Sequence, residues 1–178
     1  MELSNDTLTV SRELSELDKN VLEFTQVLDD CNVACVIVSG YVAILTGRSR
    51  STEDIDIILE TLSESETEQL VTELKDRGYW GMVMLLDEMY SMVSEGSRIR
   101  IAEEGEMYPN VETWLASNDV EREALLNPLT VTFDEGQIEI SPLELQIAYK
   151  LRLARTADSL SGKEFECTSP VPDVRGTI

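Results

Sequence analysis

Apolar residues recur along this chain at two periods, one typical of helices and the other of strands. A spacing of three and four positions predicts an amphipathic helix over 11–30, and the continuous apolar run 33–38 has the length of a buried strand. Alternating charged and apolar residues open a second predicted strand, 54–59. The other elements expected before Pro128 are a short helix over 41–46, a helix from the capping box Ser63–Glu66 to about Arg77, strands over 79–86, 89–93, 98–102 and 111–116, and a short helix capped by Asn118 and Asp119.

The remaining part of the chain predicts a hairpin and then a helix. Two apolar stretches, 129–133 and 137–140, flank Asp134-Glu135-Gly136, which is a turn sequence. The run Ser141-Pro142-Leu143-Glu144 is typical of a helix start, and the predicted helix covers 141–155. The periodicity then fades, so 159–178 is expected to be a loose tail.

This order of elements predicts one α+β domain over 1–158. It would consist of the N-terminal helix, a mixed or antiparallel sheet with helices packed on one face, and the C-terminal helix. The chain has too few alternating strand–helix units for a doubly wound parallel fold.

The charge of the chain limits the partners it can have. Acidic residues number 35 against 14 basic ones, which gives a net charge of −21. Such a charge disfavours nonspecific binding to DNA or RNA and to anionic membranes. The acids are scattered and lysine is scarce, a pattern that indicates adaptation to a halophile cytoplasm; a basic protein partner is the alternative.

The residue types exclude several chemistries. The chain has no histidine, so zinc sites with histidine ligands and Ser-His or Cys-His catalysis are excluded. Cys31, Cys35 and Cys167 lack metal-ligand spacing and are expected to be thiols in a reducing compartment. The N-terminal residues have neither the basic nor the apolar segment of a signal peptide, and no apolar run is long enough to span a membrane. A cytoplasmic protein is therefore predicted.

Asp54 and Asp56 are the first candidates for chemistry. Side chains alternate along a strand, so both carboxylates face one way and Ile55 and Ile57 face the other. Two adjacent carboxylates repel each other, and Mg²⁺ or Mn²⁺ relieves that repulsion because these ions prefer oxygen ligands. A solvated strand face in an acidic protein is the alternative.

The predicted turn Ser39-Gly40 lies between a strand and a helix. A glycine there lets the backbone approach a phosphate, and the start of a helix offers free N–H groups. Arg48 and Arg50 would contact triphosphate oxygens or pair with surface acids. Thr52 would position a phosphate or cap the strand.

Taken together, 38–57 resembles the signature of the minimal nucleotidyltransferase superfamily, whose fold is that of the DNA polymerase beta palm. That signature is a Gly-Gly or Gly-Ser turn, a short helix and an Asp-x-Asp flanked by apolar residues. The chain is most similar to the abortive-infection and toxin–antitoxin branch, in which an arginine and a threonine precede Asp-Ile-Asp. A weaker likeness continues through 111–115, the hairpin and the helix 141–150.

The resemblance implies roles for further residues. Glu112 would be the third metal-side carboxylate, with Glu103 and Glu104 as competitors, and Lys150 would be a nucleotide-side cation. The chain departs from the family in its Ser-Gly turn, in a glutamate as third acid, and in a poor match for the later acidic motif.

By this resemblance the chain would be a metal-dependent enzyme. It would move a nucleoside monophosphate from a nucleoside triphosphate to a protein or RNA acceptor, as part of a toxin–antitoxin system, with Mg²⁺ or Mn²⁺ as cofactor. The alternative is a non-catalytic protein of the same fold that binds a partner as an antitoxin-like subunit. Trp80 and four nearby methionines would supply that interface, or would pack in the core.

Overall fold

The computed structural model describes residues 2–4, 7–47, 52, 54–148 and 151. The chain separates into two compact units, 1–146 and 147–178. In the second unit, the described residues 147, 148 and 151 are helical. The elements below belong to the first unit. The predicted domain boundary at 158 lies outside the described residues.

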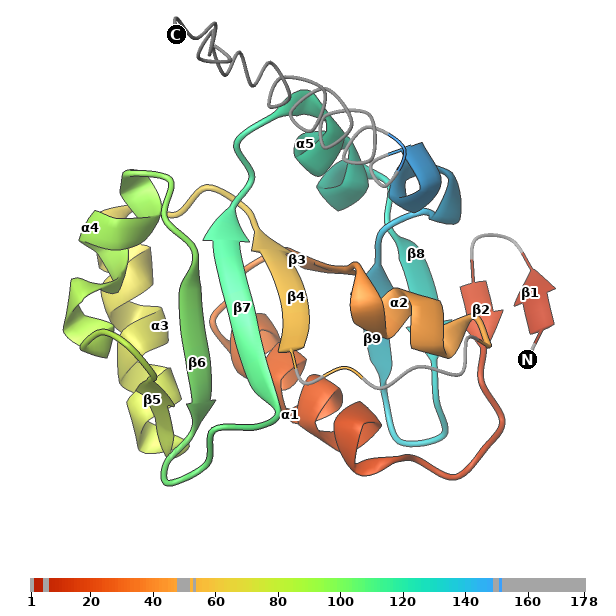
Figure 1. Cartoon of the computed structure of the whole chain (residues 1–178), viewed down its shortest axis with the longest axis horizontal. Helices are drawn as coiled ribbons and strands as arrows, with labels where there is room; N and C mark the ends of the chain where they lie inside the picture. Colours follow the sequence, from red (N-terminus) through yellow and green to blue (C-terminus); the bar gives the residue numbers. More distant parts are fainter. Residues whose placement is uncertain (1, 5–6, 48–51, 53, 149–150, 152–178) are drawn as a thin grey trace, which may run out of the picture. The chain divides into compact units, whose positions relative to one another are not determined.

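The first unit combines one sheet with helices (Figure 1). The strands are β1 (Glu2–Ser4), β2 (Thr7–Thr9), β3 (Cys35–Val38), β4 (Asp54–Leu59), β5 (Tyr79–Gly81), β6 (Ile99–Glu103), β7 (Asn110–Leu115), β8 (Leu129–Thr132) and β9 (Gln137–Ile140). The helices are α1 (Glu16–Asp30), α2 (Gly40–Leu45), α3 (Glu64–Asp76), α4 (Met89–Ser94) and α5 (Asp119–Leu126), with a 3-10 turn η1 (Leu86–Glu88). A further helix begins at Leu143.

The nine strands form a single mixed sheet in the order β1-β2-β8-β9-β3-β4-β7-β6-β5. The pairs β2–β8, β3–β9 and β4–β7 are parallel, and the other neighbours are antiparallel. The predicted α+β class with a mixed sheet is confirmed.

Helices cover both faces of this sheet, so the expectation of helices on one face is wrong. Residues of α1 and α3 pack on the face that carries Ile55 and Ile57 and form the larger core. On the other face, Ala124 of α5 packs against Ile58 and Trp114 in a smaller cluster. That second face is apolar at one end of β4 and acidic at the other. α5 covers the apolar end, where its burial is favourable.

Some predicted elements differ from the structure. The predicted strand 89–93 is the helix α4, in which Met89 and Val93, four positions apart, are both buried. The predicted strand 79–86 is limited to Tyr79–Gly81, and α1 begins at Glu16 rather than at 11 because Ser15 caps it. The short strands β1 and β2 were not predicted.

Candidate functional site

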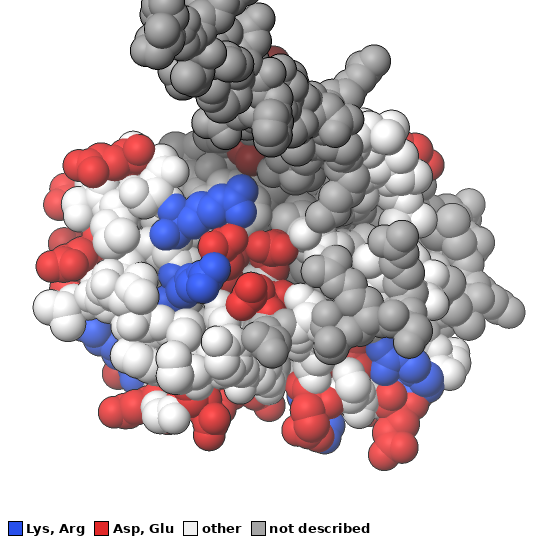
Figure 2. Space-filling view, viewed as in Figure 1, with Lys and Arg blue, Asp and Glu red and all other residues white. Residues whose placement is uncertain are grey.

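The pairing of β4 with β7 brings predicted site residues from distant parts of the sequence together. These strands are parallel, with Asp56 opposite Glu112 and Asp54 opposite Asn110. Side chains at paired positions point to the same face of a sheet. On the face seen in Figure 2, acidic side chains gather beside basic ones over the middle of the sheet. The predicted triad of Asp54, Asp56 and Glu112 therefore lies on one face.

The surroundings of Asp56 disfavour its charged form. Burial raises the pKa of this carboxyl, and the charges of Glu112 and Asp54 raise it further. A hydrogen bond from the Ser39 side chain and the positive charge of Arg98 act in the opposite direction. A half-buried carboxylate with like charges beside it is a place where a cation would be stabilised.

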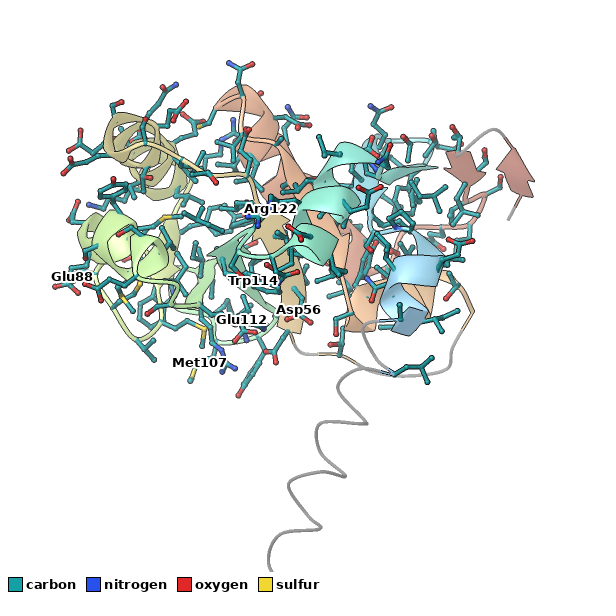
Figure 3. The ribbon with its side chains drawn as sticks, turned by 90° about the horizontal axis from the view of Figure 1, so that it is seen from above. Asp56, Glu88, Met107, Glu112, Trp114 and Arg122 are labelled. Atoms are coloured by element: carbon teal, nitrogen blue, oxygen red, sulfur yellow. The ribbon has the colours of Figure 1, made fainter. Side chains whose placement is uncertain are left out.

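Glu112 is held by two arginines, Arg100 of the neighbouring strand β6 and Arg98, which directly precedes that strand. Its carboxylate accepts from Arg98 at 3.0 Å and from Arg100 at 3.4 Å. The Arg98 guanidinium also lies over the Trp114 ring, 3.8 Å from its centroid. In Figure 3 the side chains of Asp56, Glu112 and Trp114 lie next to one another.

Sequence analysis missed these arginines. The signal available was their alternation with Ile99 and Ile101, which are fully buried on the opposite face. The alternation does not show which strand pairs with β6. β6 pairs with β7 in a register that sets Arg100 opposite Glu112.

Ser39 lies at the predicted turn between β3 and α2. Its backbone has φ 64° and ψ −119°, a conformation that favours glycine. Its N–H donates to the side-chain oxygen of Gln146 at 3.1 Å, and its side chain is hydrogen-bonded to Asp56. Gly40 is buried at the start of α2, which is six residues long. Ser39 thus contacts the acidic group directly through its side chain.

A buried cluster fixes α2 and the preceding turn against α1. The Tyr41 hydroxyl donates to Asp18 at 2.7 Å, and Arg12 and Ser15 donate to the same carboxylate. Burial alone would raise the pKa of Asp18, but the hydrogen bonds from Arg12, Ser15 and Tyr41 outweigh it and lower the pKa to about 2. Asp18 is therefore a buried anion that holds the two helices together.

The acids that competed with Glu112 lie elsewhere. Glu103 lines a cavity with Phe24 and Ile55, on the α1 face of the sheet. Glu104 is in the turn after β6, where its N–H donates to the Gly78 carbonyl. Neither carboxylate joins the Asp54–Asp56 pair.

The remaining predicted residues are only partly covered by the structure. The Thr52 hydroxyl donates to the Asp54 carbonyl at 2.9 Å. Asn110, which sequence analysis missed, donates to the Asp54 carboxylate at 2.8 Å. Arg48, Arg50 and Lys150 lie outside the described residues.

The side chains at Asp54 and Asp56 fit a divalent cation chemically. They offer oxygen ligands. Burial and the neighbouring negative charges make the ionised form of Asp56 less stable, and a bound cation would offset this. Within the described residues, no three His, Cys, Asp or Glu side chains form a group that could hold a metal ion. The adjacent carboxylate, Glu112, is paired with Arg98 and Arg100 instead.

No protein-family model matches the sequence, and no curated protein matches it either. Several solved structures, including the following two, resemble the fold. One is the lincosamide antibiotic adenylyltransferase LnuA bound to lincomycin, at 19% identity and a TM-score of 0.47, with 78% of this chain and 87% of that chain covered. The other is an antigenic nucleotidyltransferase-like protein from Paracoccidioides brasiliensis, at 17% identity and a TM-score of 0.48, with 74% and 63% covered. At these identities and scores the similarity says nothing about substrates or residue roles.

Helices in the described ranges are all too short or too polar to cross a membrane.

Proposed function

We propose that this chain is a metal-dependent nucleotidyltransferase. It moves a nucleoside monophosphate from a nucleoside triphosphate to a hydroxyl of a protein or RNA acceptor, as part of a toxin–antitoxin system. The observation that carries the proposal is the β4–β7 register, which pairs Asp56 with Glu112. The sequence resemblance at 38–57 supports the same reaction class.

In this reaction the acceptor oxygen forms a bond to the α-phosphorus, and the bond from that phosphorus to the β-phosphate oxygen breaks. Pyrophosphate leaves, and one carboxylate of the site takes the acceptor's proton. Mg²⁺ or Mn²⁺ would be held by Asp54 and Asp56, and by Glu112 once its carboxylate leaves Arg98 and Arg100, and would stabilise the charge on the phosphate oxygens. Ser39 orients Asp56 by its hydrogen bond. Gly40, Arg48, Arg50, Thr52 and Lys150 remain the proposed nucleotide contacts.

The charge of the chain favours a particular class of acceptor. With a net charge of −21, long RNA would be repelled at low ionic strength. A protein side chain or a short RNA end meets less repulsion. A partner with a basic surface would gain from the same field.

The experiment that tests this function is transfer of label from each of the four α-labelled nucleoside triphosphates to acceptors in a cell extract, with Mg²⁺ or Mn²⁺ in high potassium chloride. Wild type is compared with Asp56→Asn and with Glu103→Gln, which removes an acid from the opposite face of the sheet. Label transferred by wild type and by Glu103→Gln, and lost in Asp56→Asn, supports the proposal. Folded wild type that labels nothing with any of the four nucleotides refutes it.

A second function, partner binding without catalysis, is favoured by one specific observation. Glu112 is paired with Arg98 and Arg100, an arrangement that by itself stabilises an acidic sheet face without metal. The proposed interface residues give it less support, because Met89 is fully buried and Met84 and Met92 pack against the core. Trp80, at 36% exposure, is the member of that group that reaches the surface most clearly.

A further inference from the structure

Arg98 and Arg100 form ion pairs with Glu112, the third carboxylate of the proposed reaction. Glu112 is 19% exposed and accepts from both Arg98 and Arg100, which are more exposed, at 44% and 48%. A carboxylate in two ion pairs is a poorer ligand for a cation, because the cation must displace the guanidinium groups. The arginine pair, Arg98 and Arg100, therefore competes with metal for Glu112.

We propose that the arginine pair exchanges partners when the nucleotide arrives. Without nucleotide, Arg98 and Arg100 hold Glu112; with the nucleotide bound, they turn to its phosphate oxygens and release Glu112 to the metal side. The inference rests on the proposed function, and it adds two positioning residues that also bind substrate. Its consequence is that metal alone binds weakly, and that metal and triphosphate bind together.

The position of Arg98 suits this exchange. Its guanidinium stacks on Trp114 at 3.8 Å while one edge bonds to Glu112. The Trp114 indole N–H donates to Glu121 of α5, and that glutamate also accepts from Ser117. The ring is thus held by a hydrogen bond at its N–H edge and by packing in the smaller buried cluster. An arginine on a fixed aromatic ring can change its hydrogen-bond partner and keep its stacking contact.

The charges near the acidic group point the same way. Arg98 interacts electrostatically with Asp56 and forms an ion pair with Glu112. A bound cation would repel both arginines, whereas a triphosphate carries anionic oxygens that guanidinium groups bind by paired hydrogen bonds. Metal without nucleotide therefore opposes the arginine pair, and metal with nucleotide satisfies it.

The first part of the test uses Mn²⁺ alone and needs no nucleotide. Mn²⁺ affinity is measured calorimetrically for wild type, Arg98→Ala, Arg100→Ala and the double variant. Arg77→Ala is the control; it removes a cation that pairs with Asp30 and Glu73, away from the site. Each site variant is expected to bind Mn²⁺ roughly two- to fivefold more tightly than wild type, and the control as wild type does. Unchanged or weaker binding in the double variant overturns the proposal.

The second part uses the preformed Mn²⁺ complex of inorganic triphosphate, because the base is not identified. The double variant is expected to bind this complex about tenfold more weakly or worse, although it binds free Mn²⁺ more tightly. Arg98→Lys keeps the charge without the planar fork and is expected to fall between wild type and Arg98→Ala. A loss of folding cannot produce opposite changes in the two affinities. Triphosphate binding that is unchanged in the double variant overturns the exchange.

The two proposals fail in different ways. Wild type that binds Mn²⁺ and its triphosphate complex, with the expected variant effects, but never transfers label refutes the reaction and leaves the exchange standing. Label transfer by wild type without tighter Mn²⁺ binding in the double variant supports the reaction and refutes the exchange.

Discussion

Ser39 combines an unfavourable backbone conformation with a contact to the acidic group. Its φ of 64° with ψ −119° lies in a region that L side chains rarely adopt. A glycine would adopt it without strain but has no hydroxyl for Asp56. The residue at this turn therefore gains a hydrogen bond to the site at the expense of backbone strain.

Two substitutions separate these effects. Ser39→Ala and Ser39→Gly both remove the hydroxyl, but only glycine removes the strain. Strain of about 1–3 kcal/mol is partly offset by the greater freedom of glycine in the unfolded chain, so Ser39→Gly is expected to be more stable than Ser39→Ala by about 1 kcal/mol. Urea unfolding of both variants measures this difference. If alanine is as stable as glycine, the strain at this position is no larger than the offset from the freedom of glycine in the unfolded chain, and the expected difference is refuted.

Asp18 gives a pH-dependent contribution to stability. Its folded-state pKa is about 2, below the ordinary 3.8, because hydrogen bonds from Arg12, Ser15 and Tyr41 outweigh its burial. A lowered pKa stabilises the fold at pH values above 3.8, by about 2 kcal/mol, and this contribution is lost as the pH falls through 2. We expect Asp18→Asn to unfold more easily at pH 7 and to lose less stability than wild type between pH 5 and pH 2.

Urea unfolding at several pH values tests this expectation. Asp134→Asn, an exposed change in the β8–β9 turn, is the matched control and should follow the wild-type curve. A constant difference between wild type and Asp18→Asn from pH 5 to pH 2 would show that Asp18 stabilises the fold by its shape and not its charge.

Among the elements, α5 is joined to β7 by a buried carboxylate, that of Glu121, as well as by apolar packing. Glu121 accepts from the Trp114 indole at 3.1 Å, from the Ser117 N–H at 2.7 Å and from the Ser117 hydroxyl at 2.9 Å. Burial alone would raise its pKa, but these hydrogen bonds lower it. The helix that covers the apolar end of the sheet face is thus held beside the ring that supports Arg98.

Replacing this carboxylate is expected to loosen α5. Glu121→Gln can no longer accept all three hydrogen bonds and should lower the free energy of unfolding by about 1–3 kcal/mol. Glu123→Gln, an exposed change on the same helix, should alter it by less than about 0.5 kcal/mol. Denaturant unfolding compares the two variants. Equal effects would mean that Glu121 contributes no more than a surface acid.

Elements with local signals were predictable from the sequence. The signals for the strand Asp54–Leu59 and for the capping box at Ser63 lie in neighbouring residues of the sequence, and both elements are as predicted. The strands β1 and β2 have only three residues each, which is too short for a clear pattern. β2 is in the sheet because it pairs with β8, more than a hundred positions later in the sequence. The segment of α4 predicts a strand wrongly because a helix of six residues shows little periodicity.

The residues of the candidate site also divide into those with a local sequence signal and those that depend on long-range strand pairing. The orientation of Asp54 and Asp56 to one face was readable from alternation within one strand. Glu112 was proposed only through the family resemblance, because strand pairing between β4 and β7 is long-range. The role of Arg98 depends on two such pairings and on the Trp114 ring, so no single segment predicts it.

At the scale of the whole molecule, the dominant property is a net charge of −21. Like charges repel in the compact state, and salt screens that repulsion over a Debye length of about 10 Å at 0.1 M and about 3 Å at 1 M. The ion pairs of the described residues are largely on the surface, where each contributes little to stability, so their screening by salt lowers the free energy of unfolding only slightly. Added salt should therefore stabilise this protein.

We expect the thermal midpoint to rise by about 5 °C between 0.05 M and 1 M potassium chloride, which corresponds to roughly 2 kcal/mol for a chain of this size. Simple screening is nearly complete at 1 M, so a midpoint that levels off there indicates that charge repulsion is the whole effect. A midpoint that keeps rising at several molar salt supports the proposed adaptation to a halophile cytoplasm. A midpoint that falls from 0.05 M onward would show that ion pairs outweigh repulsion and would contradict the proposed adaptation to high salt.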